Sequence, residues 1–387
     1  MAEKKTILIF TPYYVPGFKG GGPIRSISNL VDSIGNDFNF KIITYDRDLG
    51  DESPYDGIVQ NSWNNLGNTK VFYASHDWLS FGNIKSLLEN IDYDSIYLNS
   101  FFSFKFSIVQ VLLRKLKLVP YRPIILAPRG EFSPGALNIK KLKKSVFMTL
   151  SKLVNMHSNI IWHATSLEEQ EHIKKNFGNT IATQVVPNLP SINKSDFKNR
   201  KKEKESLKLV FLSRISPKKN LDGALRMLRG VSLPLTFNVY GPIEDLDYWK
   251  ECQKIIKTLP SNIKVNYKGE INNNKVQGVF KEHDAFFFPT HGENYGHVIV
   301  EALLSKCLVI LSDQTPWREL EKSGVGWDIP LGEHENFYAA FKEIYNMDDI
   351  EMKRRSDNIN KYINKHIIDN SVVEGSIVLF SLDRIKN

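Results

Sequence analysis

Two glutamates, Glu293 and Glu301, stand eight positions apart in the segment HGENYGHVIVEALL. The segment predicts a loop followed by a helix that begins near Tyr295, so its free N–H groups would form an anion site. Most residues around Glu301 are apolar. Burying a glutamate without a partner is costly. We therefore expect Glu301 to bind either a polar ligand or a cation of the protein itself.

The spacing of the two carboxylates suggests their ligand. Eight residues at helical rise span about 12 Å, comparable to the separation of the ribose of a nucleotide from a sugar on its diphosphate. Carboxylates accept charge-assisted hydrogen bonds from neighbouring hydroxyls. We expect Glu301 to hold the ribose and Glu293 to hold the sugar, with the phosphates over the helix N-terminus.

A pair of cations follows another predicted strand, in LVFLSRISPKKN. Arg214 ends the strand and Lys219 comes five residues later, just before the predicted helix cap Asn220. A guanidinium and an ammonium together suit a diphosphate, and they can neutralise a departing nucleoside diphosphate without a metal ion. Two unrelated surface cations are the alternative.

A glycine cluster, Gly20, Gly21 and Gly22, follows the first predicted strand and precedes a helical pattern. Glycines let backbone N–H groups approach an anion or a sugar closely. The cluster does not match the dinucleotide pattern GxGxxG. A flexible loop without a ligand is the alternative.

The elements that must position these residues form one pattern twice. Near-continuous apolar runs, typical of parallel strands buried on both faces, alternate with helical segments. We predict an α/β protein with two doubly wound Rossmann-like domains facing across a deep cleft, with ligands beyond the carboxyl ends of the strands. The predicted boundaries are 1–190 and 207–365, with a charged linker at about 191–206 and a helix at about 366–387 that packs back on the first domain.

Composition narrows the class of protein. The 387 residues include only two cysteines, far apart, which fits a reducing compartment. No apolar run is long enough for a secretory signal or a membrane span, so we expect a cytoplasmic protein. A net charge of +8 favours anionic partners. No helix-turn-helix, zinc-finger or aromatic RNA-binding signature is present, so we expect no nucleic acid.

Several motifs together resemble a known family. ENYGHVIVE resembles the E-x7-E signature of retaining glycosyltransferases with the GT-B fold, especially glycosyltransferase family 4, and Arg214 and Lys219 match that family's Arg/Lys pair. VVPNLP and YYVPGFKGGG resemble the end of its first domain and its glycine loop. APRGEFSPGALNIKKLKK, WHATSLEEQ and PWRELEKSGVGWDIP resemble the branch that builds lipopolysaccharide O-antigen, capsule or exopolysaccharide in bacteria.

The resemblance implies a retaining hexosyltransferase that needs no cofactor and no metal, with front-face attack and no enzyme nucleophile. Its donor would be a nucleotide sugar (UDP-, GDP- or another) and its acceptor a saccharide or a lipid-linked saccharide bound by the first domain. The catalytic residues would be Arg214, Lys219 and Glu293. The donor contacts would be Gly21, Gly22, Asn99, Gly241, Tyr295, Gly296, His297 and Glu301. The acceptor contacts would be Arg129, Glu131 and His163.

One departure from the family concerns its D-x-x-H-x-H pattern, which touches the donor sugar. Here DSIYLNSF places Tyr97 and Asn99 at the histidine positions. Both can form hydrogen bonds, but neither carries a proton as histidine does. His163 lies at the end of another predicted strand and would face the cleft, with a packed structural histidine as the alternative.

Basic and apolar residues alternate in NIKKLKKSVFMTLSKLV, where Lys140, Lys141, Lys143 and Lys144 lie beside leucine, valine and phenylalanine. Such a segment can rest on an anionic membrane, which would place the protein on the inner face of the plasma membrane. A solvated helix face is the alternative.

Two other enzyme classes remain open. A metal-dependent transferase of the GT-A type would use a DxD triplet, and the sequence holds one at Asp46–Asp48 and another at Asp245–Asp247. An epimerase with the GT-B fold would act on a nucleotide sugar without an acceptor.

Overall fold

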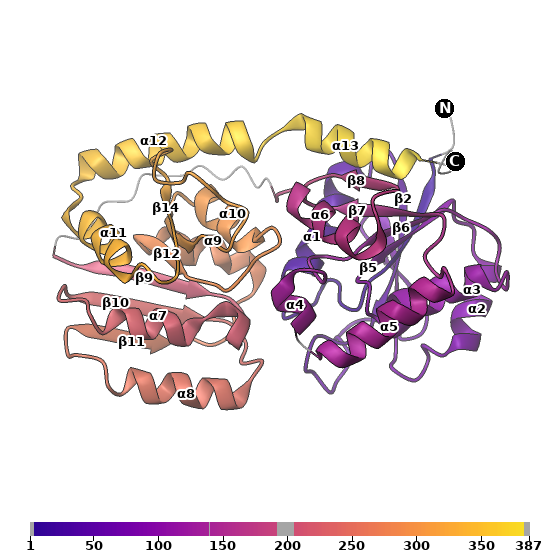
Figure 1. The fold of residues 1–387 in the computed structure, drawn as a ribbon, viewed down its shortest axis with the longest axis horizontal. Helices are drawn as coiled ribbons and strands as arrows, with labels where there is room; N and C mark the ends of the chain where they lie inside the picture. Colours follow the sequence, from indigo (N-terminus) through magenta and orange to yellow (C-terminus); the bar gives the residue numbers. More distant parts are fainter. Residues whose placement is uncertain (1–3, 139, 192–204, 383–387) are drawn as a thin grey trace. The chain divides into compact units, whose positions relative to one another are not determined.

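The computed structural model describes residues 4–138, 140–191 and 205–382. The chain divides into two compact units (Figure 1). Unit 1 comprises Met1–Leu189 and Asn370–Asn387, and unit 2 comprises Pro190–Asp369. Most of the predicted linker, residues 192–204, lies outside the described residues, as do residues 383–387 of the predicted terminal helix.

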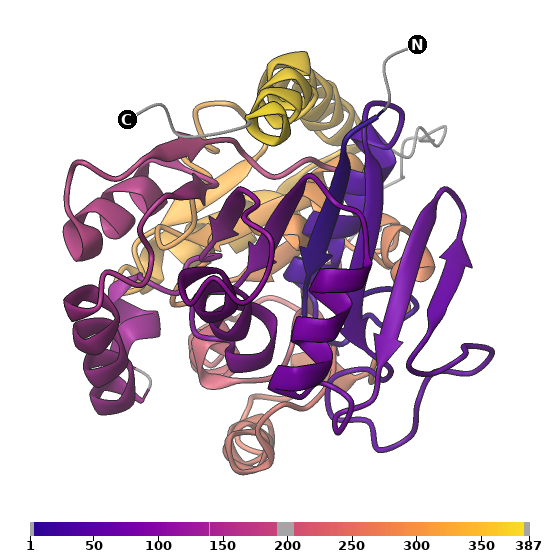
Figure 2. The same ribbon diagram turned by 90° about the vertical axis from the view of Figure 1, so that its right-hand side faces the viewer.

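Unit 1 is built on one sheet with the strand order β3-β4-β2-β1-β5-β6-β7-β8 among the described residues. Neighbouring strands are parallel except β3 and β4, an antiparallel pair at the edge of the sheet (Figure 2). Strands β5, β6 and β7 are buried at every position, as their continuous apolar sequences require. The strands are β1 (Thr6–Phe10), β2 (Asn39–Tyr45), β3 (Trp63–Leu66), β4 (Thr69–Ala74), β5 (Ser95–Asn99), β6 (Ile124–Ala127), β7 (Ile160–Ala164) and β8 (Thr183–Val185).

The helices of unit 1 are α1 (Gly22–Ile34), α2 (Phe81–Asn90), the π-helical turn η1 (Phe104–Ile108), α3 (Val109–Lys115), α4 (Pro134–Asn138), α5 (Lys141–Leu153), α6 (Leu167–Phe177) and α13 (Asn370–Ser381). Although α13 follows all of unit 2 in the chain, it packs beside α1 in unit 1 (Figure 1). The ring of Phe380 in α13 lies 6.0 Å from that of Phe38 and 5.0 Å from that of Tyr97, so this helix completes one face of the unit 1 core.

Unit 2 contains a fully parallel sheet, ordered β11-β10-β9-β12-β13-β14 among the described residues. Its strands are β9 (Leu207–Leu212), β10 (Leu235–Tyr240), β11 (Ile263–Tyr267), β12 (Ala285–Phe288), β13 (Leu308–Ser312) and β14 (Gly326–Ile329). Its helices are η2 (Pro217–Lys219), α7 (Leu221–Leu228), α8 (Leu246–Ile256), α9 (Asn273–Lys281), α10 (His297–Leu304), α11 (His334–Asn346) and α12 (Asp349–His366). The predicted α/β class with two doubly wound, Rossmann-like units is confirmed.

The strand order of each sheet fixes where a ligand would bind. From β1 the chain proceeds to β2 on one side and later to β5 on the other, and from β9 it proceeds to β10 on one side and later to β12 on the other. Ligands of open α/β sheets bind beyond the carboxyl ends of the strands at such reversals. In the described part of the chain, no helix combines the length and the apolar character that a membrane span needs.

Candidate active site

Unit 2 brings Lys219 and Glu293 together at the reversal between β9 and β12. Lys219 ends the short helix η2 after β9, and Glu293 lies in the loop after β12. The Lys219 Nζ and the Glu293 Oε1 form an ion pair whose side chains are only 10% and 15% exposed. The Lys219 Nζ also lies 5.6 Å from the centre of the Phe288 ring. The pair is shielded from water, so removing either charge leaves the other poorly solvated.

Hydrogen bonds hold the loops that carry this ion pair. The Thr290 hydroxyl donates to the carbonyl oxygen of Lys218 at 3.0 Å. The Glu293 N–H donates to the carbonyl oxygen of Gln314, in the loop after β13, at 3.1 Å. The loops after β9, β12 and β13 therefore support one another.

Arg214 lies in the same region but has a different partner. Its Nη1 donates to the Glu244 carboxylate, in the loop after β10, at 2.7 Å. Gly241 lies in that loop with φ +132°, and a Cβ added there would approach the carbonyl oxygen of Ser213 at 1.9 Å. The structure thus requires glycine at position 241 for backbone reasons. Glu244 was not among the residues predicted from the sequence, and no motif marks it.

Helix α10 begins at His297, two residues later than predicted. Gly296 precedes it with φ +77°, a left-handed conformation that glycine adopts without strain. The Tyr295 ring packs against the His297 ring at 4.8 Å, and burial raises the pKa of Tyr295. Glu301 lies inside α10, partly buried, between the buried Val300 and Ala302.

In unit 1, Arg129 is the centre of a cluster at the carboxyl ends of β5, β6 and β7. Its Nη2 donates to the Tyr97 hydroxyl and to the Asn99 Oδ1, both at 2.8 Å. Its Nη1 donates to the Asn188 Oδ1. The Asn99 Nδ2 is buried and has no hydrogen-bond partner in the part of the chain that the structure describes. Asn188 lies in the VVPNLP motif, so its neighbourhood was marked by the sequence although the residue itself was not selected.

His163 continues this cluster. Its Nε2 lies 2.8 Å from the Val186 carbonyl oxygen, which can only accept, so the Nε2 carries the proton. Its Nδ1 then accepts from the Tyr97 hydroxyl at 2.8 Å. Burial, assisted by the nearby Arg129 charge, lowers the pKa of His163 to about 3. The ring is therefore neutral at physiological pH, and its contribution to acceptor binding stays a prediction.

Glu131 supports the backbone beside this cluster. Its carboxylate accepts from the Ser100 hydroxyl at 2.7 Å and from the Phe101 and Phe102 N–H groups at 2.5 and 3.2 Å. Burial raises the pKa of Glu131, and these hydrogen bonds oppose the rise. The carboxylate thus fixes the turn after β5 in the structure, and its predicted contact with an acceptor is not tested.

Gly22 is the first residue of α1, and Gly21, just before it, has φ +69°. The Asp48 carboxylate holds their loop by accepting from the Phe18 and Lys19 N–H groups at 2.6 and 2.9 Å. Asp46 accepts from Arg47 and Gln60. In the second DxD triplet, Asp245 accepts from the Tyr248 N–H and so caps α8. Both triplets therefore have structural roles.

Two curated proteins are similar to this chain in part. One is the O-antigen chain mannosyltransferase RfbU of Salmonella typhimurium, 27% identical over 180 residues, which are 46% of this chain and 48% of that protein. The chain thus spans about half the length of this relative. An uncharacterized 41.2 kDa protein in the cps region of Klebsiella pneumoniae is 24% identical over 278 residues, which are 68% of this chain and 71% of that protein.

Solved structures match almost the whole chain in fold. Anabaena Alr3699/HepE in complex with UDP and glucose has a TM-score of 0.71 at 16% identity, over 98% of this chain and all of that one. WaaG, a glycosyltransferase involved in lipopolysaccharide biosynthesis, has a TM-score of 0.67 at 11% identity, over 97% and 99% of the two chains. The trehalose-6-phosphate synthase OtsA has a TM-score of 0.69 at 11% identity, over 98% of each chain. At these identities the likeness shows the fold alone.

The architecture excludes the GT-A alternative, because both units are doubly wound sheets of the GT-B type. The sequence of residues 192–365 matches the family Glycosyl transferases group 1. This chain therefore has the GT-B fold, and its second half is similar to the glycosyl transferases group 1 family.

Proposed function

We propose that this protein is a retaining, metal-independent glycosyltransferase of family 4 that moves a sugar from a nucleotide-sugar donor to a saccharide or lipid-linked saccharide acceptor. The observation that carries the proposal is the shielded Lys219–Glu293 pair at the strand reversal of the group 1 domain. HepE, which has the same fold, binds UDP and glucose. This supports a nucleotide sugar as the donor class.

The residues of unit 2 have distinct roles in this proposal. Lys219 and Arg214 stabilise the negative charge that grows on the leaving diphosphate. Glu293 positions the Lys219 ammonium and accepts hydrogen bonds from hydroxyls of the donor sugar. Glu301 accepts from the ribose hydroxyls. Backbone N–H groups at the start of α10 bind the phosphates, with Gly296 allowing their close approach.

The Arg129 cluster of unit 1 supplies hydrogen-bond donors for sugar hydroxyls. Arg129 is partly exposed, and its hydrogen bonds to Asn99 orient that amide so that the Nδ2 is left to donate to a sugar hydroxyl. His163 acts through the Tyr97 hydroxyl, which it holds in place, because both of its own ring nitrogens are engaged. We propose that this cluster contacts the sugars. Gly21 and Gly22, in the loop after β1, contribute further backbone groups for the donor.

The acceptor belongs, in this proposal, to O-antigen or capsule synthesis. RfbU acts on O-antigen chains, WaaG functions in lipopolysaccharide synthesis, and the Klebsiella relative is encoded in a cps region. A cytoplasmic location at the inner face of the plasma membrane follows from a lipid-linked acceptor.

Helix α5 supports membrane contact. Leu142, Val146 and Leu150 are exposed and stand at intervals of four, so they share one face of the helix. Lys140, Lys141 and Lys143 flank the first of them. An exposed apolar stripe bordered by lysines suits the surface of an anionic bilayer.

Vesicle sedimentation tests this contact. The variant Leu142→Ser/Leu150→Ser should lose sedimentation with phosphatidylglycerol vesicles. The control Ile350→Ser, at an equally exposed position in unit 2 (79% against 78% for Leu142), should keep it. Equal sedimentation of both variants, or no preference of the wild type for anionic lipid, would end the membrane proposal.

Product analysis tests the reaction. The purified protein is incubated with a panel of nucleotide sugars and acceptors, and the anomeric configuration of the product is read by NMR. We expect retention and full turnover in excess EDTA. An inverted product contradicts the retaining assignment, and loss of turnover in EDTA contradicts metal independence. Free epimerised sugar nucleotide would identify the epimerase alternative.

A further inference from the structure

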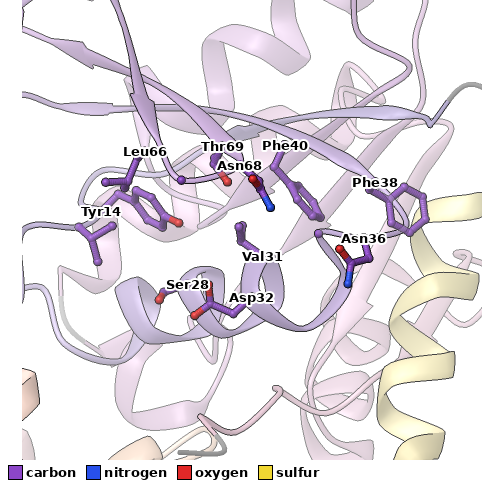
Figure 3. A pocket seen from close by; sticks show the side chains of 13 residues that line it. Tyr14, Ser28, Val31, Asp32, Asn36, Phe38, Phe40, Leu66, Asn68 and Thr69 are labelled. Atoms are coloured by element: carbon purple, nitrogen blue, oxygen red, sulfur yellow. The ribbon is translucent and has the colours of Figure 1, made fainter.

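Unit 1 contains a groove of about 450 Å³ that lies mostly outside the motifs above (Figure 3). One wall is α1, which contributes Ser28 and Asp32, together with the turn after it, which contributes Asn36. The opposite wall is the turn between β3 and β4, which contributes Asn68 and Thr69. Tyr14 lies at one end of the groove and Phe38 at the other (Figure 3).

The polar residues on this wall form a short row. Ser28 and Asp32 are spaced by four, so their side chains lie on the same side of α1, and Asn36 lies in the turn just beyond the helix. Ser28 and Asp32 are about 6 Å apart at helical rise, and Asn36 extends the row beyond the helix. Figure 3 shows the row running along the groove, opposite Asn68. A ligand that contacts the whole row must be longer than a single sugar ring.

These polar groups have no structural task in the described part of the chain. The side chains of Ser28, Asp32, Asn36 and Asn68 make no hydrogen bond or ion pair there. Partial burial, with no hydrogen bond to oppose it, raises the pKa of Asp32. The Asp32 carboxylate in turn contributes to a raised pKa of Tyr14. Asp32, Asn36 and Asn68 are exposed, so their polar groups are open to a ligand in the groove.

The charge of the groove selects the class of ligand. None of the described residues that line it is lysine or arginine, although the chain carries a net charge of +8. This lining offers no cation to a phosphate-rich ligand. A carboxylate, two amides and two hydroxyls suit the vicinal hydroxyls of a sugar, while Val31, Leu66 and Phe40 offer apolar surface to its C–H faces.

The position of the groove relates it to the glycine loop. Tyr14 and Val15 line one end, and both belong to the segment between β1 and α1 that also carries Gly21 and Gly22. From there the groove continues along α1 to Asn36, at the other end of the helix. A chain-like ligand could therefore extend from the glycine loop along α1.

We propose that this groove binds a neutral oligosaccharide, namely the part of the acceptor or product chain that trails behind the reacting sugar. The inference rests on the proposed function for the identity of that chain, but binding itself does not require turnover. In this role the groove favours long acceptors over short ones.

Direct binding tests the proposal with a panel of neutral trisaccharides (maltotriose, mannotriose and N-acetylchitotriose), measured by isothermal titration calorimetry. We expect at least one to bind the wild type. The variant Asp32→Ala/Asn68→Ala should bind it roughly ten-fold or more weakly, because a hydrogen bond to a charged group is lost. Asp37→Ala, which removes a carboxylate just beyond α1 and outside the groove, should bind as the wild type does.

Two further measurements separate this proposal from the proposed function. The donor-site variant Lys219→Met should keep trisaccharide binding even if it has lost transfer. The groove variant should keep its thermal shift with nucleoside diphosphates, and its KM should rise for long acceptors only. Unchanged trisaccharide binding in Asp32→Ala/Asn68→Ala, binding that depends on Lys219, or no binding by any trisaccharide would each overturn the inference.

Discussion

The Lys219–Glu293 pair allows a structural role to be separated from a catalytic one. Lys219→Met removes the ammonium and keeps an unbranched side chain, while Glu293→Gln removes the charge and keeps the shape. The single change Lys219→Met leaves the Glu293 carboxylate, 15% exposed, without its cation. Breaking a fully buried pair costs about 3–5 kcal/mol. Because both side chains retain some contact with water, we expect about 2–3 kcal/mol here.

This loss should be visible as thermal destabilisation of unit 2. In a domain of this size 1 kcal/mol lowers the Tm by about 2–4 °C, so the single variant should melt about 5–10 °C lower. The double variant Lys219→Met/Glu293→Gln should return to within about 1 kcal/mol of the wild type, because no uncompensated charge remains. Differential scanning fluorimetry measures both shifts.

Turnover should respond differently from stability. If Lys219 stabilises the leaving diphosphate, the double variant folds normally and still loses about 100- to 1,000-fold in kcat. The control is the exposed pair Lys250–Asp247 on α8, at 2.7 Å. Its double variant Lys250→Met/Asp247→Asn should change stability by less than about 0.5 kcal/mol and leave kcat unchanged. Wild-type turnover in Lys219→Met/Glu293→Gln would refute the catalytic role and leave a purely structural pair.

Three other predictions concern the supports of the two units. Gly241→Ala should destabilise unit 2 by about 2–4 kcal/mol, since its Cβ would lie 1.9 Å from a carbonyl oxygen. The control Gly269→Ala, where φ is +77° but the space around the Cβ is open, should cost only about 1 kcal/mol. Equal Tm values for the two variants would contradict this prediction. Tyr97→Phe should cost unit 1 about 1–3 kcal/mol, because it leaves the buried His163 Nδ1 without a donor and removes one acceptor of Arg129, whereas the exposed Tyr121→Phe should be neutral in urea unfolding. The pKa of His163 is about 3 when folded against 6.5 as the ordinary value, so the unfolded chain binds more protons between these limits. The free energy of unfolding therefore falls as pH drops below 6.5, by up to about 1.4 kcal/mol per pH unit. The variant His163→Gln should flatten this dependence between neutral pH and about pH 5. An unchanged slope in the variant would argue against His163 as its source.

Much of unit 2 could be predicted from its sequence, for a physical reason. Strands buried on both faces must be apolar throughout, so their positions are visible without an alignment. Lys219 and Glu293 each follow such a strand, and the strands prove to be neighbours. Their ion pair could not be predicted, because it depends on the backbone of two loops. One of these includes Asn220 with φ +58°, a conformation that no motif specified.

Unit 1 was less predictable, because its important contacts join segments that carry no common pattern. Tyr97, Asn99 and Arg129 were each selected separately, but the amide of Asn188 reaches Arg129 from a different part of the chain. Strand β3 was not predicted, since WNNL is short, half polar and paired on one side only. The groove along α1 also escaped notice, because its two walls are separated by more than thirty residues and neither forms a known motif.

The return of α13 to unit 1 determines the order in which the two units can be completed during synthesis. The ribosome makes residues 1–189 first, yet the face formed by Phe38, Phe40 and Tyr97 stays uncovered until residues 370–381 emerge, after all of unit 2. Unit 2 is contiguous and can fold as soon as it has left the exit tunnel. The unit that begins first is therefore finished second, and a nascent chain stalled before Asn370 would present an apolar surface to chaperones and proteases.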